Sequence, residues 1–310
     1  MSKKIVFMGT PIFAVPILKS LYQNGYPILV VYTQPPQKSK RGQKINKSPI
    51  QGISETLGIN YRTPFSLKDN NDEYEYLKKL DPDLVIVVAY GQIIPKKFLN
   101  LSKKGFINIH ASLLPKWRGA APIQRSIMNL EKETGISFMK INEKLDTGPV
   151  CNSYKIEINE KDNTETISEK LSLLASEKII SNLDDIFEDK VEFKEQIHSE
   201  ATYAPKIEKS EGQIDWNENA ESIIGKINGL YQNPGAFFIY KGERYKILKA
   251  EVASNIGKSG EVLDDYLEIS CGDKKSIKIL EIQREGKRAQ KISEFVLGSK
   301  IKKGINLNNA

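Results

Sequence analysis

Short, continuously apolar runs separated by helix-like segments constrain the fold of this chain more than any other feature. The clearest runs are Lys4–Phe7, Ile28–Tyr32, Leu84–Val88 and Phe106–Ile109. A strand that is buried on both faces is apolar throughout, which is typical of parallel sheets. Pro11–Leu21 reads as a helix, so the chain opens as a strand–helix–strand unit. The sequence therefore predicts an α/β domain, with a Rossmann-like, mostly parallel sheet and helices on both faces.

The pattern changes after Glu208, where short strands and turns replace the helical segments. The turn signals are Lys241-Gly242 and Cys271-Gly272-Asp273, and the strands around them are Phe237–Tyr240, Tyr245–Ala250, Leu267–Ser270 and Ser276–Ile282. Short strands at this spacing are typical of a small barrel. We therefore expect an OB-like β-barrel in the C-terminal part of the chain.

A helix and a polar segment lie between these two patterns. Glu165–Phe187 has apolar residues at steps of three to five, which predicts a long helix. Glu188–Ile207 is polar and poorly periodic, as domain linkers are. A length of 310 residues also favours two domains. We expect a catalytic domain at residues 1–189, a linker at 190–207 and a C-terminal domain at 208–310.

The composition excludes several classes of protein. No stretch approaches the roughly 18 apolar residues of a membrane-spanning helix, and the first residues do not read as a signal peptide. Cys151 and Cys271 lie far apart, and two histidines are too few for a histidine-rich metal site. No G-x-G-x-x-G follows the first strand, so a dinucleotide site is not expected. The sequence predicts a bacterial cytoplasmic protein without a metal ion or a membrane.

The net charge of +7 is concentrated in two segments. Lys274–Lys303 holds ten Lys or Arg and three Asp or Glu, and Thr33–Ser54 holds five basic residues and no acidic one. Ser48-Pro49-Ile50-Gln51 resembles a capped helix start, so Gln34–Lys47 is predicted to be a long basic loop before that helix. Such clusters are either solvated, lysine-rich surface or a contact for a polyanion such as RNA.

Two polar residues stand at the end of the fourth apolar run, within Gly105–Gln124. Asn108 and His110 are two positions apart, so a strand points both side chains to the same face. The amide of Asn108 can donate a hydrogen bond to an oxyanion, and the imidazole of His110 can carry a proton near neutral pH. Taken alone, such a pair is more often a turn residue and a hydrogen-bonded core histidine than a catalytic pair.

A third polar residue, Asp146, lies in Leu145-Asp146-Thr147-Gly148, between the apolar runs Ile136–Ile141 and Val150–Ile158. An aspartate in a loop between strands can reach a histidine on a neighbouring strand, orient its ring and hold a water molecule. Asp-x-Gly by itself is a common turn sequence. With Asn108 and His110, however, it completes a minimal set for acyl transfer: an oxyanion donor, a proton carrier and an orienting carboxylate.

A set of motifs surrounds these residues and extends along almost the whole chain: Met8-Gly9-Thr10-Pro11, Tyr32-Thr33-Gln34-Pro35, Val88-Ala89-Tyr90-Gly91, Asn108-x-His110, Ser112-Leu113-Leu114-Pro115, Trp117-Arg118-Gly119-Ala120-Ala121-Pro122-Ile123-Gln124, Leu145-Asp146-Thr147-Gly148, Thr202-Tyr203-Ala204 and Ile214-Asp215-Trp216. Together they resemble the formyltransferases that use 10-formyltetrahydrofolate. The resemblance implies transfer of the formyl group to the α-amino group of methionyl-initiator tRNA, for translation initiation.

This reaction implies a role for each site residue. We expect Asn108 to stabilise the oxyanion, with protonated His110 sharing that task, and Asp146 to orient His110 and relay protons through water. The folate-binding residues that the resemblance implies are Val88, Ala89, Tyr90, Gly91, Ser112, Leu113, Leu114 and Pro115. No covalent intermediate with the enzyme is expected, since the chain has no G-x-S-x-G nucleophile motif.

Contacts with tRNA are expected from both basic segments. Arg41 and Lys44 match the insertion by which the resembled family meets the acceptor end of tRNA, and Lys287 and Arg288 lie in the basic C-terminal segment. The alternatives are hydrolysis of 10-formyltetrahydrofolate, formyl transfer to a small amine such as a nucleotide sugar, and RNA binding without catalysis. The basic segments favour a tRNA substrate over the first two, and the three polar residues argue against the third. The enzyme is expected to act as a monomer.

Overall fold

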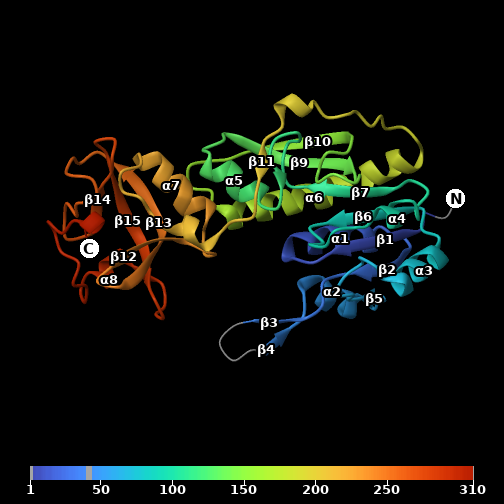
Figure 1. The fold of residues 1–310 in the computed structure, drawn as a ribbon, viewed down its shortest axis with the longest axis horizontal. Helices are drawn as coiled ribbons and strands as arrows, with labels where there is room; N and C mark the ends of the chain where they lie inside the picture. Colours follow the sequence, from blue (N-terminus) through green and yellow to red (C-terminus); the bar gives the residue numbers. More distant parts are fainter. Residues whose placement is uncertain (1–2, 40–43, 310) are drawn as a thin grey trace. The chain divides into compact units, whose positions relative to one another are not determined.

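The four apolar runs form neighbouring strands at the centre of one sheet (Figure 1). In the computed structural model, which describes residues 3–39 and 44–309, this sheet has seven strands in the order β10-β9-β7-β6-β1-β2-β5. Their bounds are β1 (Ile5–Gly9), β2 (Ile28–Tyr32), β5 (Tyr61–Arg62), β6 (Leu84–Val88), β7 (Phe106–His110), β9 (Glu133–Lys140) and β10 (Val150–Glu157). β5, β2, β1, β6 and β7 pair in parallel, and β9 pairs antiparallel with β7.

Helices cover both faces of this sheet, which confirms the predicted fold class. They are α1 (Val15–Gln23), α2 (Pro49–Leu57), α3 (Asn71–Leu80), α4 (Lys96–Leu99) and α6 (Thr164–Phe187), with short 3₁₀ turns η1 (Ile12–Ala14) and η2 (His198–Glu200). Leu77 of α3 and Phe98 of α4 share one core cluster with Val6 of β1. α1 lies beside α6, as a hydrogen bond of 2.8 Å from Ser20 Oγ of α1 to the Ser176 carbonyl of α6 shows.

Contacts within the described chain divide it into two compact units whose borders differ from the sequence-based ones. Unit 1 comprises Met1–Gly119, Thr134–Ile156 and Ser168–Tyr203, and unit 2 comprises Ala120–Glu133, Glu157–Ile167 and Ala204–Ala310. Most of the segment expected to be a linker therefore belongs to unit 1. Two short segments from within residues 1–189 belong to unit 2, because their contacts are made there.

The region before α2 follows the sequence-based expectation only in part. Ser48 Oγ accepts a hydrogen bond from the Gln51 N–H at 2.9 Å, and Pro49 is in the first turn, so α2 begins where the capping pattern predicted. The preceding segment is not simply a loop, since β3 (Gln37–Ser39) and β4 (Lys44–Asn46) pair as antiparallel strands. Lys44 is thus on β4, whereas Arg41 lies outside the described residues.

A partly buried ion pair ties β2 and β5 to α3. Arg62 Nε and Nη2 donate to the two carboxylate oxygens of Glu73 at 2.6 and 2.7 Å, and the Tyr32 hydroxyl donates to the same carboxylate at 3.0 Å. Burial, together with the negative charge of Glu73, raises the pKa of the Tyr32 hydroxyl well above its usual range. Tyr32 is therefore a neutral hydrogen-bond donor at neutral pH.

We expect Glu73→Gln to lower the free energy of unfolding by about 1–3 kcal/mol, the scale of hydrogen bonds to a charged group. The amide keeps the shape of the side chain but removes the charge that Arg62 and Tyr32 face. Urea-induced unfolding measures the change. Glu75→Gln is the control, since its exposed pair with Lys78 spans 3.9 Å and is worth about 0–1 kcal/mol. Equal effects of the two substitutions would contradict the assignment.

Unit 2 is built on a curled antiparallel sheet (Figure 1). Its described strands, in the order β12-β13-β15-β14 with β16 beside β15, are β12 (Ala236–Tyr240), β13 (Glu243–Ala253), β14 (Glu268–Ser270), β15 (Ser276–Arg284) and β16 (Gln290–Lys291). The Lys241-Gly242 turn that the sequence predicted joins β12 to β13, with positive φ at both residues, as two-residue hairpins prefer. The half-barrel is consistent with the predicted OB-like domain.

Helices complete unit 2 on this sheet. They are α5 (Pro122–Met128), α7 (Ala220–Gly229) and α8 (Ile292–Phe295), with the turns η3 (Lys209–Gly212) and η4 (Leu307–Asn309). α5 and α7 approach closely because α7 has glycines at the contact: a Cβ on Gly229 would lie 2.5 Å from Met128 Cγ, and one on Gly225 would lie 2.8 Å from Leu130 Cδ2. This packing explains why residues 120–133 belong to unit 2.

Candidate active site

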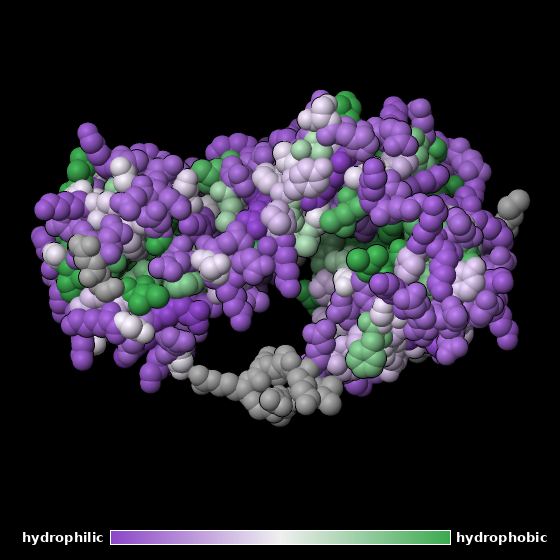
Figure 2. Space-filling view, in the orientation of Figure 1, coloured by the Kyte–Doolittle hydropathy of each residue, from purple (hydrophilic) through white to green (hydrophobic). Residues whose placement is uncertain are grey.

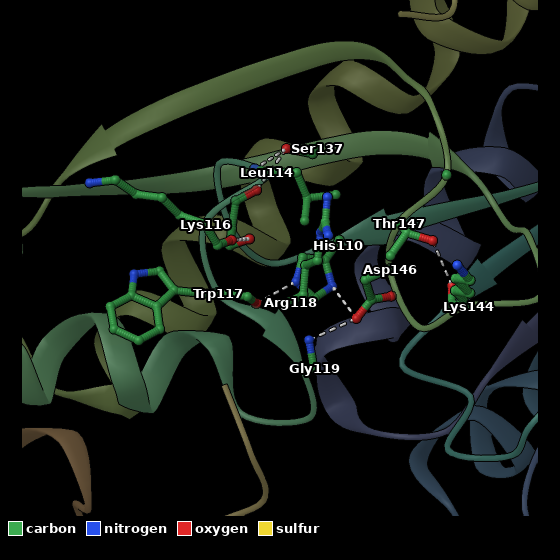
Figure 3. A network of polar contacts seen from close by, with 12 residues as sticks. His110, Leu114, Lys116, Trp117, Arg118, Gly119, Ser137, Lys144, Asp146 and Thr147 are labelled. Carbon is green, nitrogen blue, oxygen red and sulfur yellow. Dashed lines mark hydrogen bonds and ion pairs between the residues drawn. The ribbon is translucent and has the colours of Figure 1, made fainter. Parts of the chain in front are cut away.

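The end of β7 carries Asn108 and His110. Figure 3 shows His110 with its polar neighbours. In the sheet, Asn108 lies between Val87 of β6 and Met139 of β9, and His110 lies opposite Ser137 of β9. Two-residue spacing on a strand places both side chains on the same face. His110 is 6% exposed, and Asn108 is half-buried. Among the described residues none forms a hydrogen bond with the Asn108 side chain, so its amide is available to a ligand.

Both ring nitrogens of His110 face oxygen acceptors (Figure 3). Nε2 lies 2.9 Å from the Trp117 carbonyl oxygen, and Nδ1 lies 3.6 Å from Oδ2 of Asp146. A neutral imidazole has one N–H and can donate to only one of these acceptors, whereas the protonated ring can donate to both. The hydrogen bond from Nε2 to the Trp117 carbonyl can therefore hold the ring in one orientation, while Nδ1 faces Asp146 and is the nitrogen that could exchange a proton.

Asp146 is held in place through both its side chain and its backbone. Its Oδ2 accepts a hydrogen bond from the Gly119 N–H at 2.9 Å, and the residue has a φ of 50°, in the left-handed region. Its carboxylate is largely buried beside His110. The structure thus brings Asp146 to His110 across the loop between β9 and β10, as the sequence predicted.

The loop Ser112–Pro115 is fastened to β9 by Ser137. The Ser137 hydroxyl donates to the Ser112 carbonyl at 2.7 Å and accepts from the Leu114 N–H at 3.1 Å (Figure 3). Ser112 in turn donates its hydroxyl to the Lys116 carbonyl at 2.6 Å. These bonds fix the loop beside His110, since Ser137 is the neighbour of His110 across the sheet. The sequence offered no sign of this role for Ser137.

The segment expected to be a linker supplies buried contacts to the site. Gln196 is 8% exposed, and its Oε1 accepts from Arg118 Nε and Nη2 at 3.0 and 2.7 Å. Its Nε2 donates to the carbonyl oxygens of Asp146 and Gly148 at 2.9 and 2.7 Å. The Thr202 carbonyl accepts from the Arg118 N–H at 2.9 Å. Sequence analysis gave no role to Gln196, because a polar side chain that is buried and hydrogen-bonded has the same sequence signature as a solvated one.

The segment expected to bind folate, Val88–Gly91, follows β6 and is tied to the loops after β1 and β2. Thr10 Oγ1 donates to the Tyr90 carbonyl at 2.8 Å, and Gln34 Nε2 donates to the Gly91 carbonyl at 2.8 Å. The Tyr90 ring is 2% exposed and belongs to the core cluster of unit 1. Burial raises the pKa of its hydroxyl well above the usual range. Tyr90 can therefore face a ligand only through its backbone.

Lys287 and Arg288 lie in the exposed turn between β15 and β16 of unit 2. No acidic side chain of the described chain pairs with either of them. Two other cations of unit 2 differ in this respect, since Lys275 pairs with Glu221 and Arg284 pairs with Glu243. Unpaired, exposed cations are those best placed to meet an external anion.

Two other kinds of site are absent from the described residues. No helix there has the length and apolar character needed to cross a bilayer, and no group of three His, Cys, Asp or Glu residues is arranged to hold a metal ion. The visible face is largely hydrophilic (Figure 2).

Burial raises the pKa of the Cys151 thiol to about 11, so this residue is a protonated packing group rather than a nucleophile.

The sequence matches known proteins over its full length. The profile described as "Formyl transferase" matches residues 3–183, and "Formyl transferase, C-terminal domain" matches residues 206–300. A methionyl-tRNA formyltransferase from Pelagibacter ubique (strain HTCC1062) is 73% identical over 309 residues, which cover 100% of both chains. The chain belongs to the methionyl-tRNA formyltransferase family. A second member, from Caldanaerobacter subterraneus subsp. tengcongensis, is 44% identical over 98% of this chain and 99% of its own.

Membership of the methionyl-tRNA formyltransferase family makes the chain an enzyme, so RNA binding without catalysis is wrong as an alternative. A solved N-formyltransferase from Helicobacter canadensis, in complex with folinic acid and dTDP-3-aminofucose, has the same fold. The TM-score is 0.70, with 19% identity, and the match covers 90% of this chain and 99% of that chain. At this identity the likeness concerns the fold alone.

In this member of the methionyl-tRNA formyltransferase family, the backbone at Gly148, two residues after Asp146, passes so close to the backbone of Lys140 that a side chain does not fit. A Cβ at Gly148 would lie 1.9 Å from the Lys140 carbonyl oxygen, so the backbone must shift. We expect Gly148→Ala to lower kcat by about 10²-fold, the scale for a misplacement of about 1 Å in an active site. Steady-state kinetics of formyl transfer measure the effect.

Gly52→Ala is the matched control for this substitution, because nothing lies within 4 Å of the added Cβ in α2. It should leave kcat unchanged and stabilise the helix by about 0.5–1 kcal/mol. A Gly148→Ala enzyme as active as Gly52→Ala would show that the loop of Asp146 tolerates the displacement.

Proposed function

We propose that this enzyme transfers the formyl group of 10-formyltetrahydrofolate to the α-amino group of methionyl-initiator tRNA. The observation that carries the proposal is the meeting of Asn108, His110 and Asp146 at the end of β7, in a chain that matches this family along its whole length. In the transfer, the amine forms a C–N bond with the formyl carbon and the bond to the folate nitrogen breaks. One proton leaves the amine, and one reaches the folate nitrogen.

Each of the three residues has a role that fits its surroundings. The unpartnered amide of Asn108 donates to the oxyanion that develops on the formyl oxygen. His110 keeps Nε2 toward the Trp117 carbonyl, so it is Nδ1, which makes no direct hydrogen bond to Asp146 at 3.6 Å, that shares in stabilising the oxyanion when the ring is protonated. Asp146, whose Oδ2 lies 3.6 Å from His110 Nδ1, orients the ring and relays protons through a water that binds alongside the pair. No residue needs to become covalently attached to the formyl group.

The folate is proposed to lie along two loops that are held by hydrogen bonds to neighbouring segments. One is Val88–Gly91, where Ala89 and Gly91 have φ values of 46° and 80° and present backbone groups. The other is Ser112–Pro115, held by Ser137. Ile93 and Leu145 are 89% and 70% exposed, although both are large and apolar. Exposed apolar side chains next to polar groups are typical of a ligand-binding surface.

The deciding experiment measures formyl transfer with different acceptors. The enzyme is incubated with 10-formyltetrahydrofolate and charged initiator tRNA, charged elongator tRNA, an amino-sugar nucleotide or water alone. We expect rapid transfer only to the initiator tRNA. Comparable release of formate without tRNA would support the hydrolase alternative, and comparable transfer to the amino sugar would support a small-amine acceptor.

The unpaired cations of unit 2 are proposed to contact tRNA phosphates. The double substitution Lys287→Ala and Arg288→Ala should reduce the slope of log Kd against log salt by about 0.9 for each phosphate that the variant no longer neutralises. Filter binding of tRNA at several salt concentrations measures the slope. The pair Lys275→Ala and Arg284→Ala is the control, since both of these side chains are already paired with glutamates. Equal slopes for the two double variants would contradict the proposal.

Arg41 and Lys44 are proposed to act differently, by placing the acceptor end of the tRNA at the site. Arg41→Ala should therefore lower kcat for charged initiator tRNA and leave the salt dependence of tRNA binding unchanged. A change in salt dependence alone would make Arg41 part of the general electrostatic surface.

We further propose that the enzyme acts as a monomer in the bacterial cytoplasm, where charged initiator tRNA is used. Each unit has a hydrophobic core of its own within the single chain, so neither core needs residues from a second copy. Sedimentation velocity at enzyme concentrations used for catalysis tests the oligomeric state, and a stable dimer would contradict it.

A further inference from the structure

Gln196 joins two parts of the site that are far apart in the sequence. Its side-chain amide has two donor and two acceptor positions, and all four are used. The oxygen accepts from Nε and Nη2 of Arg118, and the nitrogen donates to the carbonyls of Asp146 and Gly148. The side chain therefore connects β8 (Arg118–Gly119) to the loop of Asp146.

The partner of Gln196 strengthens this connection. Arg118 is 2% exposed, and its guanidinium has only the neutral acceptors Gln196 Oε1 and His198 Nδ1 among the described residues. A buried cation that pulls on the amide oxygen polarises the amide, which makes its N–H groups better donors. The two carbonyls in the Asp146 loop are thus bound by donors stronger than those of an isolated amide.

The two neighbouring residues of β8 hold Asp146 from opposite sides. Gly119 donates its N–H to the Asp146 carboxylate at 2.9 Å, and Arg118 holds the Gln196 that binds the Asp146 carbonyl. Asp146 has a φ of 50°, in the left-handed region, which is less favourable for a non-glycine residue than the right-handed one. Without the Gln196 donors, nothing else in the described chain binds the Asp146 carbonyl.

We propose that Gln196 is a positioning residue for formyl transfer: it holds Asp146 in the orientation in which its carboxylate faces Nδ1 of His110. The inference rests on the role proposed above for Asp146, and it adds a residue outside the loops that carry the reacting groups. Gln196 itself touches neither substrate, since all of its polar atoms are occupied by the protein.

The test compares two substitutions that disturb different halves of the connection. Gln196→Glu keeps an acceptor for Arg118 but places a carboxylate oxygen against the two carbonyls, and Gln196→Met keeps the length and removes all four hydrogen bonds. We expect both to lower kcat by about 10- to 100-fold while KM for 10-formyltetrahydrofolate changes by less than about twofold. Glu195→Gln, at the exposed neighbouring position, should have no effect.

A double-mutant cycle separates positioning from general damage. If Gln196 acts through Asp146, Gln196→Glu should have almost no further effect in an Asp146→Asn enzyme and its full effect in an Asn108→Ala enzyme. Tetrahydrofolate binding and circular dichroism show that each variant is folded. If Gln196→Met fails to fold, Gln196→Glu alone completes the cycle, because it retains a partner for the buried Arg118.

Three results would overturn the inference. Wild-type kcat in Gln196→Glu, with kcat impaired in Asp146→Asn, overturns the role of Gln196 and leaves the proposed function intact. An equal loss of kcat from Gln196→Glu with and without Asp146→Asn shows general structural damage. Wild-type kcat in Asp146→Asn removes Asp146 from the proposed mechanism, and the positioning role of Gln196 falls with it.

Discussion

Replacing His110 by alanine is expected to lower kcat for formyl transfer by about 10²- to 10⁴-fold, the range for loss of a general acid–base group. His110 is the only side chain in the described site whose two nitrogens face a carbonyl at 2.9 Å and a carboxylate at 3.6 Å. It can therefore keep one proton toward Trp117 and exchange the other beside Asp146. Single-turnover rates with charged initiator tRNA measure the chemical step directly, and folate binding should survive.

The chain offers a matched control for this prediction, because its other histidine, His198, is exposed and contacts Arg118 instead. His198→Ala should reduce the single-turnover rate by no more than a few fold. Asp146→Asn should lower the rate by about 10²-fold or more, since it keeps the shape and removes the charge beside the ring. Near-normal rates in His110→Ala would exclude the histidine from proton transfer.

Asn108→Ala is expected to cost about 2.7–4 kcal/mol of transition-state stabilisation, the measured scale for loss of one oxyanion donor. The Asn108 amide has no hydrogen-bond partner in the described chain, so its donors are free for the formyl oxygen. Because the charge on that oxygen develops only in the transition state, the loss should appear in kcat with little change in KM for 10-formyltetrahydrofolate.

Asn108→Asp tests the direction of this hydrogen bond, since a carboxylate cannot donate to an oxyanion and should impair kcat at least as much as alanine. Asn24→Ala is the control, because the exposed Asn24 amide donates only to the Ser20 carbonyl of its own helix. An effect of Asn108→Ala confined to KM would make Asn108 a binding residue, and the oxyanion would then depend on His110.

Much of the fold was predictable because local patterns carried it. The strands β1, β2 and β6 are apolar at almost every position, and burial on both faces leaves them few other environments. The start of α2 followed from Ser48 and Pro49, and the β12–β13 turn from Lys241-Gly242. In each case the residues that decide the structure are within a few positions of one another.

The borders of the units were less predictable, because they depend on contacts between distant segments. Residues 120–133 belong to unit 2 through the close packing of α5 on α7, which needs Gly225 and Gly229 a hundred positions away. The polar segment 190–203 belongs to unit 1 because Gln196 finds Arg118 and the loop of Asp146 there. A polar side chain has the same sequence signature whether water or protein satisfies its hydrogen bonds.

The same distinction applies to the chemistry of the site. The identities of Asn108, His110 and Asp146, and the shared face of the first two, follow from residue types and from the period of a strand. The tertiary structure decides how these groups are held, because it brings β7, β8 and the loop after β9 together. Only then can His110 face the Trp117 carbonyl, and only then can Gln196 and Gly119 donate hydrogen bonds to Asp146. Residue types, their spacing and the family resemblance therefore predict which groups take part in acyl transfer. Distances between those groups are set by hydrogen bonds that close only after the distant segments have packed.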